Sequence, residues 1–300
     1  MTGRTGRTGR TGRTGRTGRT GRSGLSDRGD PTSFAGLDHV GAASTTLISD
    51  AILSTRGGIV GYWDVKPVSS SKTAQDWDAF RKLAPDVRSA ILDGELIEGF
   101  AFGDAACGYF GGLEQPDMPT QTDLEKVRRA ADLREDRLNE IYAQQKDMMS
   151  FFGALFNASG GRHDRTLEFI DAVLRLCVTI EMRFKFEFGV PRPVELAPEV
   201  MPIIQTPGHA ASPSGHSVES TAIAECLQHF GGTRFGHLAE RLRKRIAYNR
   251  VVAGVHYESD NEVGEKLGKA IFQFVLAKVD ACDPQTPLQL LYSKAVNEWA

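Results

Sequence analysis

Cysteine is scarce in this 300-residue chain, and the four cysteines that occur are far apart. No two of them form a CxxC pair, so the spacing matches neither a zinc knuckle nor a dense disulfide framework. Cys177 and Cys226 lie within apolar patterns of helical spacing, and we expect both to be buried thiols. The other two are Cys107 and Cys282.

Long apolar runs are also missing. No stretch reaches the roughly 18 to 20 uninterrupted apolar residues that a membrane span needs, so we expect no membrane span. No apolar core follows the N-terminal arginines, so a secretory signal is not visible, which favours a cytoplasmic over a secreted protein. Strand-like alternation of apolar and polar residues is rare. This pattern predicts an all-α fold, a helical bundle.

Acidic residues are absent from the first 22 positions. Residues 2–22 repeat Thr-Gly-Arg seven times, and a low-complexity tract of this kind has nothing to bury. We predict a disordered tail at residues 1–30 and a single helical domain at residues 31–300. The tail is open to two interpretations: a basic arm that touches anionic surfaces, or a repeat without function.

The charge balance indicates which classes of partner the chain favours. Of the 36 basic residues, seven lie in the repeat, so the rest of the chain carries 29 basic against 38 acidic residues, a net charge of −9. A mildly acidic domain does not favour nucleic acid as a partner.

Apolar residues recur at helical spacing in several parts of the chain. Thr122 and Glu125 have the form of a capping box, which marks a helix start. Pro85 is expected to separate two helices, because proline inside a helix removes a hydrogen bond. The predicted helices are two within residues 73–100, one from the capping box to residue 142, and then residues 166–184, 218–227, 234–248 and a final helix at 263–279.

Three short clusters of basic, small and imidazole residues follow one another in the C-terminal half. Together they contain three cations that stay charged at neutral pH, a small-residue turn, two histidines and a carboxylate. This set suits the binding of a tetrahedral oxyanion. The clusters are Lys185, then Arg192-Pro193 after six residues; Pro213-Ser214-Gly215-His216; and Asn249-Arg250, then His256 after five residues and Asp260 after three more.

The second cluster stands at the head of a predicted helix that ends at the glycine pair 231–232. The first N–H groups of a helix have no carbonyl partner within it, and the dipole places its positive end there. Pro213 suits the first turn, and Gly215 allows a ligand to approach the backbone closely. We therefore expect free N–H donors for an anion at Ser214 and Gly215.

His256 and Asp260 are four residues apart. On a helix this spacing puts both on one face, so we expect the carboxylate to bond the imidazole. Such a bond selects one tautomer and leaves the other ring nitrogen to act as a nucleophile or a ligand. The alternative is an ordinary His/Asp pair at the surface.

The three clusters resemble the signature of one superfamily: bacterial class A acid phosphatases, type 2 phosphatidic acid phosphatases and vanadium haloperoxidases. That signature reads Lys, six residues, Arg-Pro; then Pro-Ser-Gly-His; then Ser-Arg, five residues, His, three residues, Asp. Asn249 stands where serine is usual, which puts a polar contact in doubt. The resemblance spans about a quarter of the chain and implies the helical bundle of that superfamily. The missing membrane span argues against the integral-membrane lipid phosphatases.

The resemblance also implies roles in binding. Lys185, Arg192 and Arg250 would bind the non-bridging oxygens of a phosphoryl group. The backbone at Ser214 and Gly215 would add donors as negative charge builds up. The ligand would be a small phosphorylated molecule.

The catalytic roles follow in the same way. His256, held by Asp260, would attack phosphorus and form a phosphohistidine. His216 would protonate the leaving oxygen and then activate water. On this interpretation the protein is a phosphomonoesterase of the acid phosphatase type that requires no metal and no cofactor.

The same resemblance leaves a second activity open: a vanadate-dependent haloperoxidase that oxidises halide with hydrogen peroxide. His256 would then be the vanadium ligand and His216 the acid/base. His209, seven residues before His216, resembles the extra histidine of bromoperoxidases and would lie at the halide site or support it. Against this, only 32 residues separate His216 from Asn249, the compact spacing of the phosphatases, so we favour the phosphatase. A non-catalytic oxyanion-binding protein would lack one of the histidines.

Overall fold

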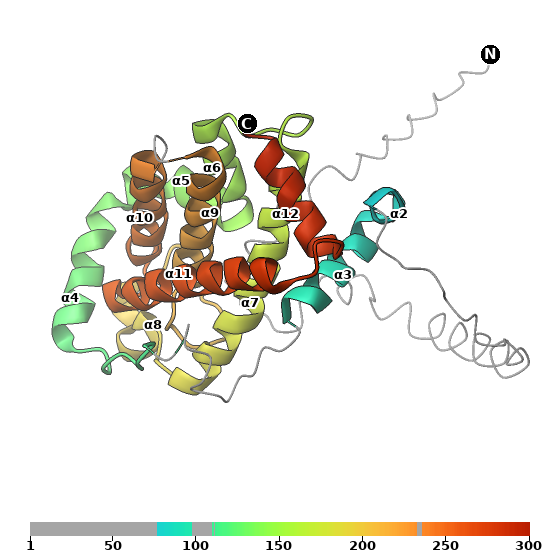
Figure 1. The fold of residues 1–300 in the computed structure, drawn as a ribbon. Coiled ribbons are helices and arrows are strands. Elements are labelled where there is room, and N and C mark those ends of the chain that lie inside the picture. Colours follow the sequence, from blue (N-terminus) through green and yellow to red (C-terminus); the bar gives the residue numbers. More distant parts are fainter. Residues whose placement is uncertain (1–76, 98–109, 111, 233–235) are drawn as a thin grey trace, which may run out of the picture.

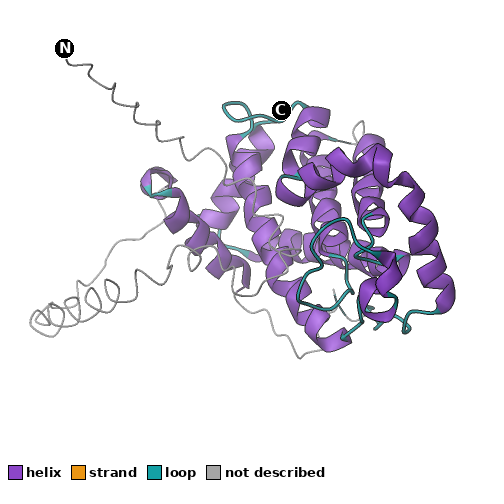
Figure 2. Ribbon diagram, turned by 180° about the vertical axis from the view of Figure 1, so that it is seen from behind, coloured by secondary structure: helices purple, strands orange, loops and turns teal. Residues whose placement is uncertain are grey.

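The computed structural model describes residues 77–97, 110, 112–232 and 236–300. Every regular element in these ranges is a helix, which confirms the predicted all-α bundle (Figure 2). No helix in them is long and apolar enough to cross a membrane. The predicted tail, residues 31–76 of the predicted domain and Cys107 lie outside the described residues.

Three helices meet at the centre of the bundle: α7 (Asp164–Phe188), α9 (Gly215–Gly231) and α11 (Glu258–Ala281). Most residues of α9 are buried, because α7, α10 (Gly236–Val252) and α11 pack around it. Figure 1 shows α11 running across α9 and α10. The predicted thiols Cys177 and Cys226 are both fully buried in this core.

The remaining helices surround this centre. A group of loops, which includes connections next to the short α8, lies together on the face that Figure 2 turns toward the reader. The surrounding helices are α2 (Trp77–Lys82), α3 (Pro85–Ile97), α4 (Gln121–Ala130), α5 (Arg134–Lys146), α6 (Met149–Phe156), α8 (Pro193–Leu196) and α12 (Pro287–Asn297), with 3₁₀ turns η3 (Ala131–Leu133) and η4 (Pro198–Val200).

Four details of the predicted helices are wrong. The capping box joins Thr120 and Asp123, two residues before the predicted one, and the helix that follows is interrupted by η3. Apolar spacing does not reveal this interruption, because a 3₁₀ turn keeps nearly helical dihedral angles. The helix predicted at residues 263–279 begins five residues earlier, and it is not the last. It is followed by α12, whose buried face packs on α7 and α3.

The contact between α9 and α11 is unusually close because two glycines of α11 face α9. A Cβ atom on Gly264 would lie 2.8 Å from the backbone oxygen of Ser214. A Cβ atom on Gly268 would lie 2.5 Å from the backbone oxygen of Val218. Backbone atoms cannot rotate away as side chains can, so any larger residue would push the helices apart.

We expect Gly268→Ala to destabilise the fold by about 1–3 kcal/mol, the usual cost of overpacking. The control is Gly94→Ala in α3, where an added Cβ meets nothing within 4 Å and alanine should instead stabilise the helix by about 0.5–1 kcal/mol. Denaturant unfolding of the two variants provides the measurement. Equal midpoints would contradict the close contact, because both positions gain the same helix propensity.

An ion-pair cluster joins α10 to α11. Arg243 is 3% exposed and donates from Nη2 to Glu265 Oε1 at 2.6 Å, and Glu240 and Lys269 complete the cluster. The hydrogen bond from Arg243 is the main reason that the pKa of Glu265 falls from 4.5 to about 2. Since α10 carries Arg250 and α11 carries Asp260, this cluster helps to hold two of the candidate residues in register.

The lowered pKa of Glu265 predicts a pH dependence of stability. The folded pKa lies below the unfolded one, so the stabilisation is present above about pH 4.5 and is lost as the pH falls toward about 2. Glu265→Gln should flatten the loss of stability in this window, measured by thermal unfolding across the pH range. Glu262→Gln, at an exposed carboxylate of the same helix, should leave the wild-type slope unchanged.

Candidate functional site

The residues of the three clusters come together from helix ends and the loops next to them. They are contributed by the last turn of α7, the residue before α8, the first residues of α9, the last turn of α10, the segment between α10 and α11, and the first turn of α11. All their side chains are buried: Lys185 and Arg192 are 1% exposed, and Ser214, His216, Arg250, His256 and Asp260 are 0% exposed.

The imidazole of His256 lies between a carboxylate and a guanidinium. Its Nδ1 atom is 3.2 Å from Asp260 Oδ2, and its Nε2 atom is 3.0 Å from Arg192 Nη1. A carboxylate accepts hydrogen bonds and a guanidinium only donates them. The Asp260 contact therefore selects the tautomer with the proton on Nδ1 and the lone pair on Nε2. Arg192 Nη1 is also 3.5 Å from Nδ1, so the guanidinium lies against the ring beside both nitrogens.

The predicted contact between His256 and Asp260 is present, but its geometric basis was predicted wrongly. His256 precedes α11, which begins at Glu258, so the two residues do not share a helical face. Asp260 is instead in the first turn, and its Oδ2 atom also accepts from the Tyr257 N–H at 2.9 Å. The carboxylate thus caps the start of α11 and reaches back to the imidazole that precedes it.

The guanidinium of Arg192 is held on several sides. It donates from Nη1 to the Val255 oxygen at 2.8 Å and from Nε to the His209 oxygen at 3.0 Å. Its Nη2 atom is 3.1 Å from His209 Nδ1, and the same ring nitrogen is 3.2 Å from the Ala210 oxygen. The half-buried His209 therefore lies beside the guanidinium.

The start of α9 meets both α7 and α11. Lys185 donates to the Pro213 oxygen, and Ser214 is the N-cap of α9, so Pro213 precedes the helix instead of lying in its first turn. We expected a free N–H group at Ser214, but this group donates to the Asp260 main-chain oxygen at 2.9 Å. The Ser214 hydroxyl oxygen is buried without a hydrogen-bond partner. The N–H groups of Ser217 and Val218 donate to the Ser214 oxygen, so the donors offered to an anion are the N–H group of Gly215 and the Ser214 hydroxyl.

One residue of this region was missed from the sequence. Gln144 of α5 is 0% exposed, and its main-chain oxygen is 3.2 Å from His216 Nε2. Its Oε1 atom accepts from Asn249 Nδ2 at 2.9 Å and is 3.4 Å from Arg250 Nη2. The signal in the sequence was a polar residue at a core position of a helical pattern, three residues after Ile141.

The arrangement suits an oxyanion. Three cationic side chains, an imidazole lone pair and a helix N-terminus belong to one hydrogen-bonded region, and such groups bind phosphate-like or vanadate-like ions. The buried Ser214 hydroxyl adds a polar atom that a ligand oxygen would satisfy. In the described part of the chain, no group of three or more His, Cys, Asp or Glu residues is arranged for a metal cation.

Comparison with known proteins adds one similarity. No family model matches the chain, and no curated protein matches it. Among solved structures, a bacterial vanadium-dependent iodoperoxidase matches with 17% sequence identity and a TM-score of 0.45. The match covers 58% of this chain and 54% of the iodoperoxidase, so it spans about half of the length of the iodoperoxidase.

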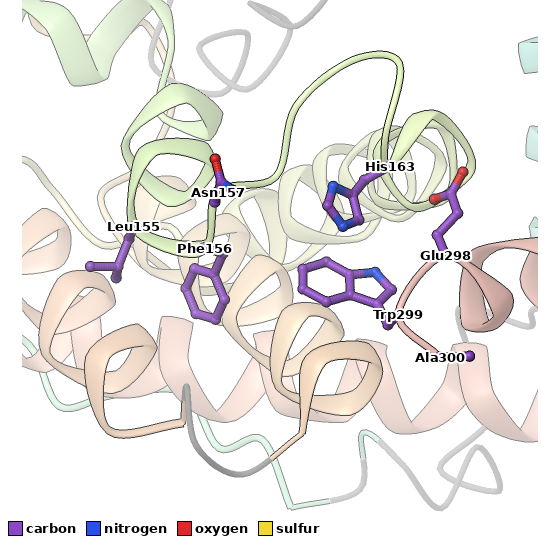
Figure 3. Close-up of a pocket in the computed structure, with 7 residues that line it drawn as sticks. All are labelled: Leu155, Phe156, Asn157, His163, Glu298, Trp299 and Ala300. Carbon is purple, nitrogen blue, oxygen red and sulfur yellow. The ribbon is translucent and has the colours of Figure 1, made fainter.

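A pocket of about 330 Å³ contains none of the candidate residues. It lies where the end of α6 meets the residues after α12, with the rings of His163 and Trp299 4.4 Å apart (Figure 3). Its carboxylate, Glu298, accepts from the N–H groups of Arg165 and Thr166 at 2.8 Å each. These contacts cap the N-terminus of α7, so this carboxylate has a structural role.

The tautomer of His256 can be measured. In ¹⁵N NMR spectra of the ligand-free protein we expect Nδ1 to be protonated and Nε2 to carry the lone pair. Asp260→Ala removes the acceptor for the Nδ1 proton, so the population of this tautomer should fall. Glu258→Ala removes an exposed carboxylate at the same helix start and should change nothing. A wild-type spectrum with the proton on Nε2 would contradict the arrangement.

Proposed function

We propose that the protein is a phosphomonoesterase of the acid phosphatase type that hydrolyses phosphate esters of small molecules. The observation that carries this proposal is the buried His256, whose Nδ1 faces Asp260, which leaves the lone pair on Nε2, with Arg192 Nη1 3.0 Å from that nitrogen. An imidazole prepared in this way is a nucleophile placed beside a group that binds phosphoryl oxygens.

In the first step the phosphoryl group binds to Lys185, Arg192 and Arg250. Arg192 Nη1, which lies beside the imidazole in the free protein, now donates to a phosphoryl oxygen. His256 Nε2 attacks phosphorus, the N–P bond forms, and the bond from phosphorus to the leaving oxygen breaks. The leaving oxygen takes a proton from His216, and Asp260 stabilises the positive charge on the His256 ring.

In the second step water replaces the imidazole. His216 accepts a proton from the water, whose oxygen attacks phosphorus. The N–P bond breaks, and its electron pair returns to His256 Nε2. Inorganic phosphate leaves, and Arg192 Nη1 again lies beside the imidazole. Throughout both steps the cations and the first N–H groups of α9 neutralise the charge on the phosphoryl oxygens.

A specific contact supports a second candidate function, a vanadate-dependent haloperoxidase. His209 places an additional imidazole against Arg192, next to the proposed oxyanion site. The residues that would hold vanadate are the same three cations, with His256 Nε2 as the metal ligand. When bound, vanadate would supply the activation of hydrogen peroxide for halide oxidation. Haloperoxidases with this signature usually carry a longer insert between the second and third clusters. We favour the phosphatase because only residues 232–235 separate α9 from α10 here.

Two assays on the purified protein distinguish these functions. The first measures hydrolysis of an aryl phosphate with and without vanadate, and the second measures bromide oxidation by peroxide after loading with vanadate. Hydrolysis that vanadate inhibits, without bromide oxidation, selects the phosphatase. Bromide oxidation that depends on vanadate selects the haloperoxidase, and the absence of both activities rejects the two proposals together.

The histidines are expected to dominate the rate. His216→Ala should lower kcat for the aryl phosphate by about 10²–10⁴-fold, the usual contribution of a general acid or base. His256→Ala should lower kcat at least as much, because no nucleophile remains. His237→Ala, at an exposed histidine of α10, is the control and should retain full activity. Thermal unfolding of each variant checks the fold, and hydrolysis retained in both would remove the mechanism.

A further inference from the structure

We propose that Gln144 is a positioning residue that holds the phosphate-binding Arg250 and the acid/base His216 in place. Asn249 fixes the side chain of Gln144 by a hydrogen bond. The inference rests on the proposed function, because it assigns to α5 the placement of two groups of the same site. Neither Gln144 nor any other α5 residue belongs to the three sequence clusters. Their connection to α5 is therefore a feature of the tertiary structure.

The main chain of Gln144 acts on His216. Its carbonyl oxygen is 3.2 Å from His216 Nε2, and a carbonyl can only accept, so the proton of the neutral ring lies on Nε2. The proton that the ring gives to and takes from the reaction is therefore carried on Nδ1. His216 and His256 thus use opposite ring nitrogens for chemistry, since Asp260 holds the proton of His256 on Nδ1.

The side chain of Gln144 acts on Arg250. Its Oε1 atom is 3.4 Å from Arg250 Nη2, and the same nitrogen donates to the main-chain oxygen of Ile141 at 3.1 Å. These two acceptors are three residues apart on α5, so both lie on the helix face toward Arg250. Together they determine the direction in which the guanidinium presents its remaining donors.

The amide of Gln144 is itself oriented without ambiguity. Its Nε2 atom donates to Glu140 Oε1 at 2.8 Å, and Glu140 also accepts from Arg245 Nη2 at 2.8 Å. A carboxylate cannot donate, so the nitrogen end of the amide must face Glu140 and the oxygen end must face Arg250. This chain of contacts transmits the position of an exposed ion pair to the buried site.

Asn249 completes the arrangement and accounts for the one departure from the superfamily pattern. Its Nδ2 atom donates to Gln144 Oε1 at 2.9 Å, and its Oδ1 atom accepts from Arg137 Nη1 at 2.9 Å. A serine side chain in the same place is shorter and ends in a single oxygen atom, so it cannot contact both Arg137 and Gln144. Asparagine at this position and glutamine at 144 therefore work as one pair.

The test measures binding of inorganic phosphate by calorimetry and the kinetics of aryl-phosphate hydrolysis. Gln144→Met keeps the length of the side chain and the main-chain contact to His216, but it removes the acceptor for Arg250. We expect Kd and KM to rise about tenfold, since a hydrogen bond to a charged group is lost, while kcat stays within about threefold. A residue that only supports the fold would lower the unfolding midpoint and leave Kd unchanged.

Asn249→Ser provides an independent variant and keeps the test available should Gln144→Met fold poorly. It should raise Kd for phosphate by about threefold, because Gln144 loses the hydrogen bond from Asn249. The double variant should bind phosphate no more weakly than Gln144→Met alone, because Asn249 acts through Gln144. Multiplied effects in the double variant would overturn the pairing.

Tyr142→Phe is the matched control on the same helix. It removes a hydrogen bond from α5 to the Ile203 oxygen, 2.9 Å long, at a half-exposed side chain, and should leave Kd for phosphate unchanged. A wild-type protein that binds phosphate, with Kd unaltered in both Gln144→Met and Asn249→Ser, overturns this inference and leaves the proposed function standing. A wild-type protein that neither binds phosphate nor hydrolyses the ester overturns both.

Discussion

The close approach of α11 to α9 is the constraint on which the rest of the site depends. Glycine at 264 and 268 allows the two backbones to touch, and the Ser214 N–H then reaches the main-chain oxygen of Asp260. The N-termini of both helices consequently lie next to each other. Their dipoles point positive ends toward one region, which favours an anion before any side chain is counted. The cationic side chains add to a field that the backbone has already set.

Order in the site comes from groups that can only donate or only accept. Carboxylates, main-chain carbonyls and guanidinium groups each leave one choice for the ring or amide that they touch. Asp260 determines the tautomer of His256, the Gln144 carbonyl determines that of His216, and Glu140 in turn orients the Gln144 amide. A site built in this way is arranged before the substrate arrives, so little reorganisation is needed during the reaction.

Periodicity and local motifs were sufficient for much of the fold. The helix before Lys185, the helix after Ser214 with its end at the glycine pair, and the buried thiols all follow from residues close together in sequence. The errors arose where a local pattern has two solutions. Thr120 and Thr122 are both possible caps, and His256 can bond Asp260 from a helix or from the loop before it. Spacing alone does not separate such pairs, because both satisfy the same short-range geometry.

The sequence by itself determined which groups are available: three cations that stay charged at neutral pH, two imidazoles, a carboxylate and a small-residue turn, in a fixed order. These are properties of residue type and spacing, so a single chain is enough to read them. The tertiary structure alone decided that the Ser214 N–H is occupied, that Arg192 lies against the His256 ring, and that Gln144 of α5 joins the site. Each of these contacts links residues 46 or more positions apart, and only the packing of helices brings such residues within hydrogen-bonding distance.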